Sequence, residues 1–135
     1  MSRPRGTLIA AACLLAASSL SAHHNMSAVF DFNDRVSLSG TLTKVDWRNP
    51  HIYLFLDVKA DVKAPAAGQL ETWSNEGPSP GFFRTRDISS AEFQSAIGKT
   101  ISAEASRARD GSKSGLIRTV KLPDGKVIEL CPQNC

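Results

Sequence analysis

Alternating aliphatic and polar residues recur along most of the chain and predict a mainly β fold. The clearest stretch is 51–58, where every second residue is aliphatic and the residues between are polar or aromatic. This two-residue period is typical of a strand that buries one face. Weaker versions of the pattern predict strands at 36–42, 69–75, 100–107, 116–122 and 126–130. The aliphatic phase shifts by one residue near Lys44, which indicates a β-bulge.

Two helix starts interrupt the strands between the third and the fourth. Ser79-Pro80 joins a capping serine to proline at the first helical position. Ser89 and Glu92 have the spacing of a capping box, and Gly98 is placed to end that helix. This order predicts a small OB-like Greek-key barrel of five to six strands, with a short helical segment between strands 3 and 4. A small open α+β sheet would have the same order.

The first 22 residues have the features of a secretory signal peptide. Two arginines precede an uncharged, apolar or small stretch at 7–20, and small residues lead to Ala22. That stretch is shorter than the roughly 20 apolar residues of a membrane span, which argues against an uncleaved anchor. Cleavage after Ala22 makes His23 the first mature residue, whereas cleavage after Ser21 leaves Ala22 before it. Acylation at Cys13, as in a lipoprotein, is the third alternative.

We therefore expect a periplasmic or secreted protein that retains no stable membrane span after cleavage near Ala22. The mature chain, 23–135, is predicted to be one domain with a polar N-terminal segment (23–33) and a cysteine-containing tail (131–135). It keeps 14 basic and 13 acidic residues, because the signal peptide holds two of the 16 basic residues and no acidic one. A net charge of +1 does not favour nucleic-acid binding.

The mature chain retains two cysteines, Cys131 and Cys135. In an oxidising compartment such a pair predicts a disulfide, which here would close only a small loop. A thiol pair that binds a metal is the alternative.

The three histidines suggest a copper site. His23 and His24 lie at or beside the predicted mature N-terminus, Met26 follows, and His51 begins the central predicted strand. Imidazole, thioether and a free α-amine are donors that suit copper. Alternatively, the two N-terminal histidines are simply solvated and His51 is structural.

A second set of residues predicts a ligand-binding face. Trp47, Tyr53 and Trp73 offer rings on which a small molecule, a glycan or a protein partner could stack, with Glu76 beside them. The alternative is that these rings belong to the core. No nucleophile elbow or other catalytic signature is present, so we expect a non-catalytic binding or accessory module rather than an enzyme.

Several short motifs occur in a characteristic order. They are His23-His24-x-Met26, Trp47-x-Asn49-Pro50-His51, Trp73-x-x-Glu76, Ser79-Pro80, Asp110-Gly111-Ser112 and Leu122-Pro123-Asp124-Gly125. Together they resemble DUF6152, a family of small exported bacterial proteins. The resemblance covers nearly the whole mature chain and implies a secreted or periplasmic β-rich domain without an established activity. This chain differs from the family pattern at Gly81, where asparagine is usual, in lacking a glycine-tryptophan pair after the helix, and in its cysteine tail.

Overall fold

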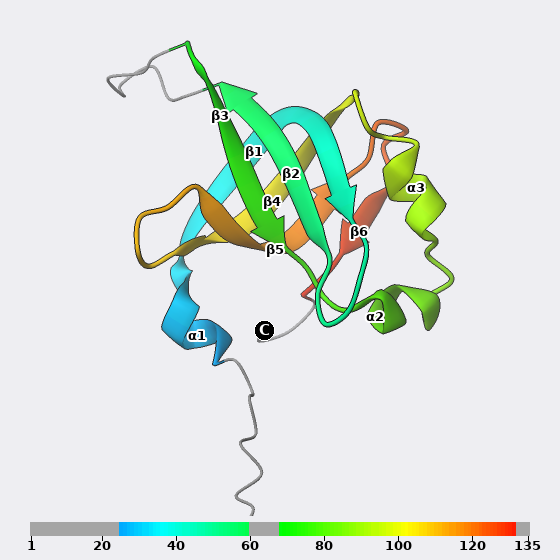
Figure 1. Cartoon of the computed structure of the whole chain (residues 1–135), viewed down its shortest axis with the longest axis horizontal. Helices are drawn as coiled ribbons and strands as arrows, with labels where there is room; N and C mark the ends of the chain where they lie inside the picture. The colour runs from blue at the N-terminus through cyan, green and yellow to red at the C-terminus, as the bar shows by residue number, and fades with distance from the viewer. Residues whose placement is uncertain (1–24, 60–67, 132–135) are drawn as a thin grey trace, which may run out of the picture.

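Six strands and three short helices make up the part of the chain that the computed structural model describes, residues 25–59 and 68–131 (Figure 1). In chain order they are α1 (Met26–Val29), β1 (Phe30–Asp46), β2 (Tyr53–Lys59), β3 (Leu70–Glu76), α2 (Pro80–Arg84), α3 (Ser90–Gln94), β4 (Thr100–Ala108), β5 (Ser114–Lys121) and β6 (Val127–Glu129). None of the helices in these residues is long and apolar enough to cross a membrane.

The long strand β1 organises the sheet. Its first half pairs with β4 and its second half with β2, both antiparallel, and Gly40 takes part in both pairings. Strand β2 pairs with β3, and β4 pairs with β5. A short parallel pairing of Ser74–Glu76 with Ser114–Leu116 joins β3 to β5, so the hydrogen bonds run in a ring. Strand β6 pairs with β5 alone among the described strands.

The core is formed by the inward residues of the strands and by the two helices after β3. In the segment around β2, Ile52, Leu54 and Leu56 are fully buried while the alternate residues are partly exposed. Helices α2 and α3 add Phe83 and Phe93, both 0% exposed. Full burial of a phenylalanine stabilises a fold by about 1.5–3 kcal/mol, so these short helices are held mainly by packing.

The mainly β fold predicted from the alternation is confirmed, and so are several local details. The β1–β2 register shifts between Leu42 and Lys44, where the bulge was expected. Proline is at the first position of α2, and the Ser89 backbone N–H donates to Glu92 Oε1 at 3.1 Å, as in a capping box. Strand β1, however, already begins at Phe30, inside the segment expected to be a polar lead-in. Burial of that phenylalanine (2% exposed) against β4 and β5 explains the earlier start.

Candidate functional site

A small cavity of about 120 Å³ brings together side chains from three separate parts of the chain. Met26 comes from α1, His51 from the connection just before β2, Tyr53 from the first position of β2, and Glu76 from the end of β3. The remaining lining residues are Val29, Phe30 and Pro50. We refer to this feature as the Met26–His51 cavity.

Strand register places three of these side chains together. Tyr53 is directly opposite Glu76 in the β2–β3 pairing, and directly opposite residues have adjacent side chains. The pairing continues one residue further, because the Gly77 backbone N–H donates to the Ile52 carbonyl at 2.9 Å. His51 and Tyr53 flank buried Ile52 on the chain, so the two-residue period turns both toward the outer face of the sheet.

Hydrogen bonds determine which atoms of the cavity can bind a ligand. The Tyr53 hydroxyl donates to Glu76 Oε2 at 3.2 Å. His51 Nδ1 lies 3.2 Å from the Gly77 carbonyl oxygen and 3.5 Å from Glu76 Oε1. Both of these oxygens accept, so Nδ1 carries the proton in the neutral ring and Nε2 keeps its lone pair. The side chain of His51 is 30% exposed and that of Glu76 15%.

The Tyr53 hydroxyl is a hydrogen-bond donor at neutral pH. Burial raises the pKa of Tyr53 above its ordinary value of 10.0, and the charge of Glu76, its hydrogen bond and the charge of Asp46 raise it further. The phenol therefore remains protonated and holds Glu76 in place.

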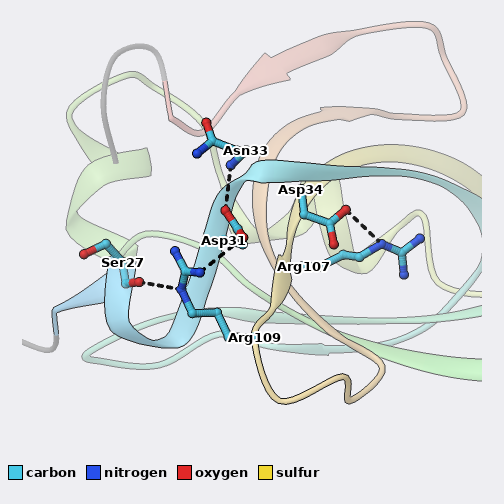
Figure 2. A network of polar contacts seen from close by, with 6 residues as sticks. All are labelled: Ser27, Asp31, Asn33, Asp34, Arg107 and Arg109. Carbon is cyan, nitrogen blue, oxygen red and sulfur yellow. Dashed lines mark hydrogen bonds and ion pairs between the residues drawn. The ribbon is translucent and has the colours of Figure 1, made fainter.

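Met26 reaches this cavity because two arginines of β4 and the following turn hold the N-terminal segment (Figure 2). Arg109 Nε donates to the Ser27 carbonyl at 2.8 Å, and Arg109 Nη1 contacts Asp31 Oδ2 at 3.2 Å. Arg107 Nε lies 3.4 Å from Asp34 Oδ1. These contacts hold α1 and the start of β1 against the end of β4.

The predicted metal ligands are only partly described. Met26 and His51 line the same cavity, whereas His23 and His24 lie outside the described residues. Within residues 25–59 and 68–131, no group of three or more histidine, cysteine, aspartate or glutamate side chains could hold a metal ion. A metal at this cavity would therefore need donors beyond His51 and Glu76.

The residues predicted to form one aromatic face are not continuous. Trp73 is 3% exposed and lies opposite Leu56 in the β2–β3 register, so both point into the core. The Trp47 ring is 4.6 Å from the ring of Phe83, between centroids, and so packs against helix α2. Tyr53 and Glu76 instead line the Met26–His51 cavity. Trp73 therefore belongs to the core, the alternative that the sequence left open for these rings, because its phase in β3 is inward.

The structure describes only one cysteine of the predicted Cys131–Cys135 disulfide. Cys131 is described, but Cys135 lies outside, so their pairing stays a prediction.

The sequence analysis did not predict that Glu76 and Tyr53 lie next to His51. The available signal was the alternation at 51–58, which already placed His51 and Tyr53 on one face. The β2–β3 register that adds Glu76 could not be obtained from that pattern.

Comparison with known proteins identifies the family. No curated protein and no solved structure matches the chain. The model of a family of unknown function, DUF6152, matches residues 11–118. The match extends into β5, so β6 and the cysteine tail lie beyond it. Because the match covers well over half of the sequence, the chain belongs to the DUF6152 family.

Proposed function

We propose that this protein is an exported, non-catalytic binding or accessory module that binds copper at the Met26–His51 cavity. The observation that carries the proposal is that Met26, in α1, and His51, in the connection before β2, line one cavity. We further propose an OB-like Greek-key barrel located in the periplasm or secreted after cleavage near Ala22. The ring order β1-β2-β3-β5-β4 and the position of α2 and α3 between β3 and β4 support that topology.

The donor chemistry of the cavity supports copper. The His51 Nε2 lone pair is available because Nδ1 donates toward the Gly77 carbonyl, an arrangement that orients metal-binding histidines in many proteins. Met26 offers a thioether, a soft ligand that favours Cu(I), while imidazole nitrogen suits both oxidation states. Glu76 would act through His51, whose ring it helps to orient.

The covalent chain limits how far the N-terminal histidines can be from this cavity. Met26 is two positions after His24, with Asn25 between them, so their Cα atoms are at most about 7 Å apart. Cleavage after Ala22 would add the His23 α-amine, and cleavage after Ser21 would add the amine of Ala22. Either product supplies nitrogen donors beside the thioether of Met26.

The test begins with protein expressed with its own signal, whose intact mass establishes the mature N-terminus. Cu(I) and Cu(II) are then titrated against competing chelators. We expect one-to-one binding that is lost in the His23→Ala/His24→Ala double variant and weakened at least tenfold in His51→Gln and Met26→Leu. A synthetic peptide with the sequence of residues 23–33 is the control. Equal copper affinity of peptide and protein would show that His51 is not a ligand. Absence of competitive binding would refute the copper proposal.

The second candidate function is a metal-free module that binds a small molecule, a glycan or a protein through an aromatic face. The observation that favours it is that Trp47 is only partly buried and lines a cavity of its own. The affinity for such a ligand should not change when His23 and His24 are replaced and should fall when Trp47 is replaced. Binding lost in the double histidine variant would contradict it.

A further inference from the structure

A second cavity lies between the β1–β2 connection and the helices α2 and α3. In Figure 1 these two helices lie together on one side of the barrel, away from α1. The cavity has a volume of about 440 Å³, within the range of small-molecule sites. Trp47, Pro80 and Ile88 form its apolar lining, and Arg84, Asp87 and Ser89 are among its polar residues. It shares none of its lining residues with the Met26–His51 cavity. We refer to it as the Trp47 cavity.

The indole of Trp47 is held in position without a ligand. Its ring centroid is 4.6 Å from that of Phe83 and 5.3 Å from that of Phe93, with tilted geometry in both pairs. Both phenylalanines are 0% exposed, so they form a rigid support. A ring that is already oriented loses little conformational entropy when it binds, which favours a ligand that stacks on it.

The polar residues of the Trp47 cavity are complementary in their hydrogen-bonding roles. Arg84 can only donate, ionised Asp87 can only accept, and the Ser89 hydroxyl can do both. Arg84 and Asp87 are exposed, and within the described part of the chain neither has an ion-pair partner. One positive and one negative charge at the same cavity favour neither an anionic nor a cationic ligand. They favour a neutral ligand whose groups both donate and accept.

The backbone fixes the position of Asp87. This residue has φ 55°, a left-handed conformation that is uncommon outside glycine but tolerated by aspartate. The turn around it is closed by the Ile88 backbone N–H, which donates to the Phe83 carbonyl at 3.1 Å. Because Phe83 also supports Trp47, the aromatic surface and the carboxylate belong to one packed unit. A left-handed residue with this hydrogen bond is a common way for a helix to end, so the termination of α2 itself fixes the turn.

We infer that the Trp47 cavity binds a neutral pyranose sugar unit of a glycan. A pyranose ring presents C–H groups on one face, which match the indole of Trp47. Its hydroxyls lie around the ring edge and each can donate and accept, which matches Arg84 and Asp87 together. This inference deepens the second candidate function by naming its ligand class, and it does not depend on copper binding.

The test uses the two tryptophans of the mature protein as separate probes. Each indole N–H gives its own signal in a ¹H–¹⁵N NMR spectrum, and Trp73, at 3% exposed, is the internal reference. Cellotetraose and chitotetraose are titrated into the ¹⁵N-labelled protein. We expect a saturable shift of the Trp47 indole and of the Asp87 and Ile88 amides with at least one of them, while the Trp73 indole does not move. Absence of a saturable shift with both sugars would overturn the inference.

Matched variants identify the residues responsible. Arg84→Met keeps the aliphatic part of the side chain and should weaken binding at least tenfold, and Asp87→Asn keeps a residue that tolerates the left-handed backbone and should weaken it several-fold. Lys121→Met, which removes a cation from an exposed position outside the cavity lining, should bind as the unmodified protein does. Equal weakening in all three variants would overturn the assignment. So would shifts of Trp47 with a proline-rich peptide but with neither sugar.

The inference and the copper proposal fail separately. The His23→Ala/His24→Ala variant should keep its affinity for the sugar while losing copper. Sugar binding that disappears in this variant would contradict the location of the site at the Trp47 cavity.

Discussion

Replacing Arg109 with methionine should loosen the N-terminal segment that carries Met26 while the β-sheet remains folded. The substitution removes the donor to the Ser27 carbonyl and the ion pair with Asp31. It retains the backbone bond from the Arg109 N–H to the Val29 carbonyl, at 2.9 Å. The segment should therefore still dock, but less tightly.

The size of the effect follows from exposure. The side chains of Arg109 and Asp31 are 49% and 33% exposed, so their ion pair contributes at most about 1 kcal/mol. The hydrogen bond to the Ser27 carbonyl adds about 1 kcal/mol. A total loss of about 1–2 kcal/mol in the opening free energy corresponds to roughly a tenfold change in the population of the open segment.

Hydrogen exchange measures this opening directly. The Ala28 amide donates to the Asn25 carbonyl and the Phe30 amide to the Met26 carbonyl, so both report on α1. Protection of these two amides should fall about tenfold in Arg109→Met, while amides in the centre of β2 keep theirs.

A matched control is Lys113→Met, which removes another half-exposed ion pair, between Lys113 Nζ and Glu71 Oε2 at 3.0 Å. It should leave the protection of Ala28 and Phe30 unchanged. Unchanged exchange in Arg109→Met, or equal loss in both variants, would refute the view that Arg109 holds this segment.

Three further predictions concern stability. Gly40→Ala would place a Cβ 2.2 Å from the Asp57 carbonyl oxygen and should lower the free energy of urea unfolding by about 3 kcal/mol; an unchanged urea midpoint would contradict this. Gly98 has φ +83° and open space around it, so Gly98→Ala should cost about 1 kcal/mol and Gly98→Asn less, and equal costs would argue against backbone strain. The hydrogen bond from Lys126 lowers the pKa of Glu92, with help from the Ser89 backbone. This contribution is complete above the ordinary value of 4.5 and is lost as the pH falls through the folded-state pKa, so Glu92→Gln should show a smaller loss of thermal stability on acidification.

Part of the candidate site was predictable and part was not. The donor atoms of His51 and Met26 were enough to predict both residues as candidate metal ligands. Which of the aromatic residues belong to the core could not be predicted, because aromatic character does not reveal which face of a strand a residue occupies. The Trp47 cavity was not predicted, since it depends on the path of the turn at Asp87 between two short helices.

The sequence by itself determined the local elements of this protein. The strands near 51–58 and 100–107, the bulge near Lys44 and the helix starts at Ser79 and Ser89 follow from side-chain period, proline geometry and capping, which act over a few residues. The tertiary structure alone decided three other features: the parallel closure of β3 against β5, the burial of Trp73, and the meeting of Met26 with His51. These depend on the register between strands distant in sequence. A shift of one residue in register would turn each side chain to the opposite face, and no local pattern specifies which partner a strand will take.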